Sequence, residues 1–166
     1  QESKEVVRIR PGVIIVEHRL GYVHANAGID RSNIEGSDER VLLLPLDPDA
    51  SAEALRQQFA REQGVDIRVI INDSAGRAWR NGTVGFALGT AGFKPLVDLV
   101  GQTDLTGRPL EVTSVAVADE LAAAASFLMG QASEGQPVVV LSGAVLDSAN
   151  CGAGELIRAK SEDLFR

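Results

Sequence analysis

The sequence predicts a mixed α+β fold with largely antiparallel sheets and a few packed helices. Strand-like residues 6–10 and 12–18 flank Pro11-Gly12, which is typical of a turn between paired strands. Further along, capped helical segments alternate with strands. With 166 residues, 45% of them apolar, the chain is long enough for one ordinary domain, and we assign residues 1–166 to it.

Residues 22–25 continue the N-terminal antiparallel system and lead into a polar loop at residues 25–33. This loop combines small residues and a glycine with Asp30 and Asn33. Small residues allow close backbone approach, and the two polar side chains offer oxygen atoms to a ligand. We therefore expect this loop to form part of a binding site.

A strand, a helix and a second strand are expected next. Residues 34–40 are interpreted as a loop and residues 41–46 as a buried strand end. Residues 47–51 supply a turn and helix cap, and Gly64 ends the helix. Residues 67–71 form the clearest buried strand, so the order suggests a βαβ unit with Asp73 just after its second strand.

The second half of the sequence alternates in the same way. Residues 82–92 are too rich in glycine for a helix and predict a strand with close backbone contacts. A polar loop at 98–109 precedes a strand at 111–117 and an alanine-rich helix at about 118–129. Residues 137–141 predict the last strong strand.

Composition limits the classes of function and setting. The formal net charge of -7 argues against a nucleic-acid partner. No apolar run is long enough to cross a membrane, and the single cysteine, Cys151, is consistent with a reducing cytoplasm. The chain starts at Gln1 without an initiator methionine and ends abruptly at Arg166, so we expect a fragment of a longer polypeptide.

Asp30 and Asp73, each after a predicted strand, could bind one metal ion. Mg²⁺ and Mn²⁺ prefer a few carboxylates with neutral oxygens, and Ser74 could add a hydroxyl. The alternative, that both aspartates only cap turns, fits the spacing equally well.

Other polar residues have simpler alternatives. Arg77 and Arg80 could bind a carboxylate or phosphate, or they could be solvated beside a core or interface Trp79. Asp119-Glu120 is interpreted as favourable charge in a first helical turn. His18 and His24 are expected on one strand, in ordinary packing or in solvent. A lone Cys151 is expected to be inert.

Five blocks, in order along the chain, carry a resemblance to a known family. They are NAGIDRSN at 26–33, LLPLDPDAS at 43–51, NDSAGRAWRNG at 72–82, AVADELA at 116–122 and DLF at 163–165. Together they resemble the coenzyme F420-0:L-glutamate ligase family (F420 gamma-glutamyl ligase). The resemblance implies the fold of that family and a GTP- and divalent-metal-dependent amide ligase. Such an enzyme adds L-glutamate to coenzyme F420-0 and then further γ-linked glutamates, through an acyl phosphate.

The resemblance also assigns roles to individual residues. It places Mg²⁺ or Mn²⁺ on Asp30, Asp73 and Ser74, with Glu155 as a further metal ligand and a monovalent cation such as K⁺ as another candidate. Ser74 stands where the family commonly has threonine, which keeps the hydroxyl. The nucleotide contacts implied are Asn33, Gly154, Glu155, Leu156, Ile157, Arg158, Ala159, Lys160 and Ser161.

The remaining expectations concern partners and completeness. The resemblance implies F420-0 and L-glutamate as substrates and a homodimer. We assign Arg77 and Arg80 to gripping a substrate carboxylate or phosphate. The family's N-terminal segment with a nucleotide-binding Ser-Lys pair has no counterpart here. Two alternatives therefore stay open, an inactive fragment that serves as a binding or dimerisation module, and an amide ligase for a different acid.

Overall fold

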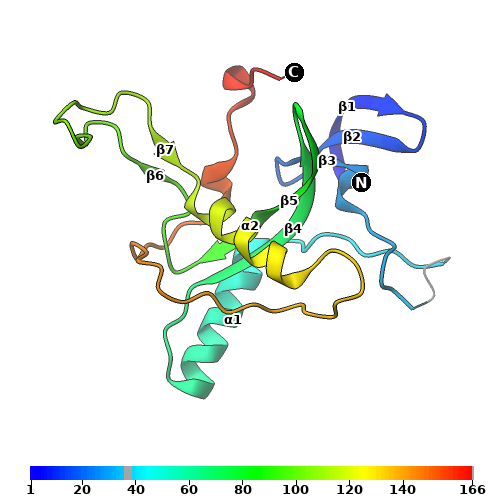
Figure 1. The fold of residues 1–166 in the computed structure, drawn as a ribbon. Coiled ribbons are helices and arrows are strands. Elements are labelled where there is room, and N and C mark those ends of the chain that lie inside the picture. The colour runs from blue at the N-terminus through cyan, green and yellow to red at the C-terminus, as the bar shows by residue number, and fades with distance from the viewer. Residues whose placement is uncertain (36–38, 166) are drawn as a thin grey trace.

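A three-stranded antiparallel sheet forms the N-terminal part of the computed structural model, which describes residues 1–35 and 39–165 (Figure 1). Strand β1 (Ser3–Arg10) pairs with β2 (Val13–His18), and β2 pairs with β3 (Val23–Ala25). Gly12 takes a left-handed φ of 83° in the turn between β1 and β2, where glycine meets no steric penalty. The predicted hairpin and its third strand are confirmed.

A long two-stranded ribbon runs through the middle of the molecule (Figure 1). It consists of β4 (Val69–Arg77) and β5 (Arg80–Ala91), paired antiparallel, with a bulge where Ile71 faces Gly89 and Asn72 faces Ala87. The predicted βαβ unit is therefore wrong, because residues 41–46 form no strand and β4 pairs antiparallel with the strand that follows it. The strand predicted at 67–71 also extends further than expected, and Asp73 lies inside it.

Two helices were predicted and both are confirmed. Helix α1 (Pro48–Gln63) begins after Asp47, whose side chain accepts a hydrogen bond of 2.9 Å from the Ala50 amide. It ends at Gly64 in the left-handed conformation. Helix α2 (Val117–Met129) follows Ala116 and ends at Gly130.

Both helices pack closely on β5. A Cβ atom added to Gly89 would lie 2.3 Å from the Pro48 carbonyl carbon, and one added to Gly85 would lie 2.6 Å from the Ala122 oxygen. The glycine-rich sequence of β5 thus lets the backbone of each helix approach the strand, as the sequence predicts. A small core forms there, with Ala87, Phe93, Ala118 and Ala122 buried together.

Three predicted strands are wrong or shorter than expected. Residues 41–46 form only an isolated bridge between Leu42 and Asp30, and Leu43 and Leu46 are exposed. Of residues 111–117, only β7 (Ser114–Val115) is a strand, paired with β6 (Val97–Asp98). Residues 137–141 make no strand, and Val138 and Val140 are 78% and 89% exposed.

Candidate functional site

The loop after β3 is held in an unusual backbone conformation. Its first residues form a short 3₁₀ turn, η1 (Asn26–Gly28), in which Asn26 and Ala27 have φ of 52° and 57°. The Asn26 side chain accepts a hydrogen bond from the Ile14 amide, at 3.1 Å, which fixes the turn against β2. Non-glycine residues with positive φ are uncommon, and such strain often accompanies functional loops.

Asp30 organises the exposed end of the same loop. Its carboxylate accepts hydrogen bonds from the Ser32 amide at 2.8 Å and the Ser32 hydroxyl at 2.7 Å, and from the Arg31 amide. These hydrogen bonds hold the pKa of Asp30 below its usual value. Asp30, a predicted metal ligand, is therefore an ionised carboxylate at the surface. Its own hydrogen bonds to Arg31 and Ser32 stabilise the turn in which it lies.

Asp73 lies inside β4, opposite Phe86, and contacts a histidine. Its Oδ1 accepts a hydrogen bond of 2.7 Å from the Ser74 amide, and its Oδ2 lies 3.4 Å from Nε2 of His24. Strand β3, which carries His24, contacts β4 and leads into the loop of Asp30. The N-terminal sheet and the ribbon thus meet where these polar groups lie.

The sequence did not indicate that His24 belongs to this site. The two histidines lie on different strands, His18 at the end of β2 and His24 in β3, so their predicted placement on one strand is wrong. Both are buried, and Asp73 raises the pKa of His24. His24 lies beside Asp73 because β3 and β4, which belong to different sheets, contact each other, and no local sequence pattern signals that contact.

Of these groups, the structure brings together the Asp73 carboxylate and the buried Nε2 of His24, which has no hydrogen-bond partner. Asp30 lies in the exposed loop, where its hydrogen bonds are to Arg31 and Ser32. Ser74 follows Asp73 directly in β4, where successive side chains point to opposite faces. Within residues 1–35 and 39–165, no group of three or more His, Cys, Asp and Glu side chains is arranged to hold a metal. A cation here would therefore take further ligands from neutral oxygens, water or phosphate, as Mg²⁺ and Mn²⁺ commonly do.

Asn33 links the loop to the segment that follows α2. It has a φ of 54°, and its Nδ2 donates a hydrogen bond of 2.8 Å to the carbonyl oxygen of Ala132. This contact holds the side chain across two parts of the chain that are distant in sequence. Its predicted nucleotide contact stays a prediction.

Arg77 and Arg80 lie at the far end of the ribbon, at the last position of β4 and the first of β5. Both are exposed, and Arg77 donates a hydrogen bond of 3.2 Å to the Gly82 carbonyl. Between them Trp79 has a φ of 64° and is 87% exposed, with its ring centroid 6.2 Å from that of Phe165. Trp79 is thus not a core residue.

The predicted nucleotide segment forms short 3₁₀ turns. They are η2 (Ala153–Leu156) and η3 (Lys160–Glu162), joined by extended residues. Glu155 is exposed and interacts with the Cys151 thiol, while Lys160 forms an ion pair with Glu5. The roles predicted for Gly154–Ser161 stay predictions.

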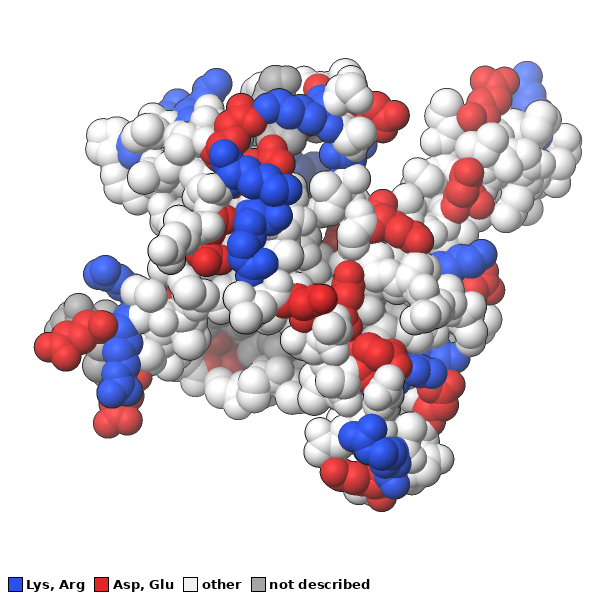
Figure 2. Space-filling view, turned by 180° about the vertical axis from the view of Figure 1, so that it is seen from behind, with Lys and Arg blue, Asp and Glu red and all other residues white. Residues whose placement is uncertain are grey.

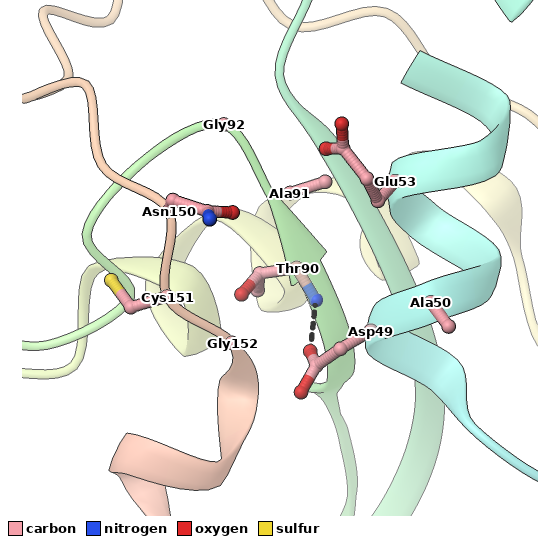
Figure 3. Close-up of a pocket in the computed structure, with 9 residues that line it drawn as sticks. All are labelled: Asp49, Ala50, Glu53, Thr90, Ala91, Gly92, Asn150, Cys151 and Gly152. Atoms are coloured by element: carbon pink, nitrogen blue, oxygen red, sulfur yellow. Dashed lines mark hydrogen bonds between the residues drawn. The ribbon is translucent and has the colours of Figure 1, made fainter. Parts of the chain in front are cut away.

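Asp49, which the sequence suggested only as part of a helix cap, accepts hydrogen bonds from two distant parts of the chain. Its Oδ1 accepts hydrogen bonds from the Thr90 amide at 2.8 Å and the Ala153 amide at 2.9 Å. The carboxylate borders a pocket of about 250 Å³ between α1, the end of β5 and residues 150–152 (Figure 3). The pKa of Cys151, also in this pocket, is raised by burial and by Glu155, which agrees with an inert thiol.

A larger and more apolar groove, of about 800 Å³, lies between α1, β4, α2 and residues 137–146.

Acidic and basic side chains are interspersed on the face shown in Figure 2. Among the described residues, no helix has both the length and the apolar character needed to cross a bilayer.

Fold and site together define an α+β protein. Two helices pack on a central ribbon, and the ribbon contacts the N-terminal sheet where the Asp73 carboxylate lies beside the His24 imidazole.

Comparison with known proteins places this α+β protein in a family. The family model described as F420-0:Gamma-glutamyl ligase matches residues 1–143, so the chain belongs to that family. It is 46% identical, over 165 residues, to a coenzyme F420:L-glutamate ligase of Methanocaldococcus jannaschii. It is 47% and 46% identical to proteins with the same description from Methanothermobacter thermautotrophicus and Archaeoglobus fulgidus.

The similarity covers nearly all of this chain and part of each relative. The alignments include 99%, 99% and 100% of the chain, and 65%, 66% and 65% of the three relatives in the same order. The chain thus spans about two thirds of the length of the relatives it matches.

Proposed function

We propose that this chain contributes to a GTP- and divalent-metal-dependent ligase that joins L-glutamate to coenzyme F420-0 and then adds further γ-linked glutamates. The observation that carries the proposal is 46% identity to a coenzyme F420:L-glutamate ligase over 99% of the chain. The polar groups at the junction of the N-terminal sheet and the ribbon support it, because they suit a cation that binds phosphate.

The reaction must activate a carboxylate before an amine can attack it. The γ-phosphoryl group of GTP passes to the F420-0 carboxylate, which gives an acyl phosphate and GDP. The glutamate amine then attacks the acyl carbon, the amide bond forms, phosphate leaves and the amine proton passes to solvent. Mg²⁺ or Mn²⁺ neutralises the charge of the phosphate oxygens.

In this proposal, the chain's own residues position the reactants. Asp30, Asp73 and Ser74 hold the cation, with Glu155 as a further ligand and K⁺ as an additional cation. The low pKa of Asp30 supports this role, since a carboxylate that is already ionised binds a cation without first losing a proton. Asn33 and residues 154–161 contact the nucleotide.

Arg77 and Arg80 are proposed to grip a substrate carboxylate or phosphate. Their exposure at the tip of the ribbon leaves both guanidinium groups accessible to a ligand. In Arg77→Ala and Arg80→Ala, the apparent affinity for glutamate or GTP should fall. Unchanged affinities in both variants would remove these residues from the proposed site.

The proposal is tested by titrating GTP with Mn²⁺ onto the chain in a calorimeter, followed by a chromatographic assay with F420-0 and L-glutamate. We expect metal-dependent GTP binding, glutamylated product, and loss of Mn²⁺ binding in Asp73→Asn. Absence of GTP binding would favour an inactive binding or dimerisation module. GTP binding without product from F420-0 would favour a ligase for a different acid.

We also propose that the protein forms a homodimer and works in the cytoplasm. Sedimentation analysis tests the homodimer.

A further inference from the structure

The two ring nitrogens of His24 have different surroundings. Nδ1 lies 3.1 Å from the carbonyl oxygen of Ala25, and a carbonyl can only accept, so Nδ1 carries the hydrogen. In the neutral ring, Nε2 then carries a lone pair. That atom is buried without a hydrogen-bond partner, in a side chain that is only 8% exposed.

A carboxylate oxygen of Asp73 lies close to this nitrogen. The distance from Nε2 to Oδ2 is 3.4 Å, longer than the usual N–H···O hydrogen bond of about 2.9 Å. Two donor atoms that bind one ion at about 2.1 Å, with an angle between about 90° and 110°, lie about 3.0 to 3.4 Å apart. The separation thus suits two ligands of one cation.

His18 provides an internal comparison. Its Nε2 lies 3.3 Å from Oε2 of Glu2, and its Nδ1 accepts a hydrogen bond of 3.1 Å from the Leu20 amide. Both of its nitrogens are therefore engaged. Metal-binding histidines typically donate one ring N–H to a carbonyl or carboxylate and present the other nitrogen to the metal, and only His24 of the two histidines has this arrangement.

We propose that Nε2 of His24 and Oδ2 of Asp73 bind the same divalent cation, which makes His24 a metal ligand and a determinant of metal choice. This inference rests on the metal dependence in the proposed function. An imidazole nitrogen favours Mn²⁺ and later transition metals over Mg²⁺, which prefers oxygen ligands. The site therefore binds Mn²⁺ more tightly than Mg²⁺.

Pulsed electron paramagnetic resonance with Mn²⁺ alone tests the proposal without an activity assay. The chain with natural nitrogen should show a ¹⁴N coupling, and the same chain with ¹⁵N-labelled histidine should show a ¹⁵N coupling in its place. In His24→Gln the coupling should disappear, and Mn²⁺ affinity should fall by about tenfold or more while Mg²⁺ affinity changes less. His18→Gln, the matched control, should keep the coupling.

The outcomes separate this inference from the proposed function. Mn²⁺ that binds in a manner dependent on Asp73 but shows no histidine nitrogen coupling overturns the role of His24 and leaves the ligase proposal intact. Absence of any bound Mn²⁺, measured from the free-ion signal, overturns both. Because the isotope comparison uses the unmodified sequence, it decides the question even where a variant fails to fold.

Discussion

Asp49 joins three segments that are far apart in the sequence. Its Oδ1, in the first turn of α1, accepts hydrogen bonds from the backbone amides of Thr90 and Ala153. These bonds connect the helix to β5 and to the C-terminal residues. The sequence predicted a helix cap in this region because Asp47 and Pro48 are local signals. It could not predict the two distant donors, because nothing local encodes them.

Replacing Asp49 with alanine should cost more stability than replacing the cap residue. Asp49→Ala leaves two amides without their acceptor, and we expect a loss of about 3 kcal/mol in the free energy of unfolding. Asp47→Ala removes one capping bond and should cost about 1 kcal/mol. Urea unfolding followed by circular dichroism measures both, and an equal or reversed order would show that Asp49 does not join these segments.

Asp119 is a second helix carboxylate that holds β5, through a hydrogen bond of 2.9 Å from the Ala87 amide. Burial raises its pKa above the usual value. The folded state then binds the proton more tightly than the unfolded state, so this group makes stability fall as pH rises from about 4, the ordinary carboxyl range.

Asp119→Asn replaces the titratable carboxyl group with an amide. The amide oxygen can still accept the hydrogen bond from the Ala87 backbone amide. We expect the variant to equal the parent protein near pH 4 and to be at least as stable at pH 7, because the cost of ionising a buried carboxylate is gone. Urea midpoints at a series of pH values provide the measurement. A variant that becomes progressively less stable than the parent with rising pH would contradict the assignment.

At the scale of elements, β5 depends on glycine where the helices cross it. We expect Gly89→Ala to lower the free energy of unfolding by about 2 kcal/mol or more, because its Cβ would meet the backbone of Pro48 at 2.3 Å. Gly76, in the paired strand β4, has no atom within 4 Å of an added Cβ, so Gly76→Ala serves as the control. Equal effects of the two substitutions would argue against close packing of α1 on β5.

The elements that sequence analysis predicted share a local signal. Turn residues and caps, such as Gly12, Asp47 and Gly64, mark the first hairpin and α1. The failures concern apolar runs at 41–46 and 137–141, whose composition suits a strand but whose pairing partner is not encoded nearby. The βαβ prediction failed for the same reason, and so did the placement of His18 and His24 on one strand.

At the scale of the whole molecule, the chain divides into paired and unpaired regions. The ribbon and both helices carry regular hydrogen bonds, whereas the described residues 137–146 contain no strand or helix and line one side of the apolar groove. Local stability should follow this division, since amides outside hydrogen-bonded elements open at little cost.

Hydrogen exchange read by mass spectrometry should reveal that division. Amides in β4 and β5 should exchange at least about tenfold more slowly than those in residues 137–146. Peptides from α1 and α2 provide internal references. Protection of residues 137–146 equal to that of the ribbon would mean that this segment is paired in solution.

Trp79 determines how this molecule can be followed by spectroscopy. It is the chain's single tryptophan, it is largely in water, and its ring neighbour is Phe165 near the C-terminal end. Its emission should already resemble that of an unfolded chain, so fluorescence will report poorly on global unfolding. The same indole is a sensitive reporter of any ligand or surface that covers the tip of the ribbon, where Arg77 and Arg80 lie.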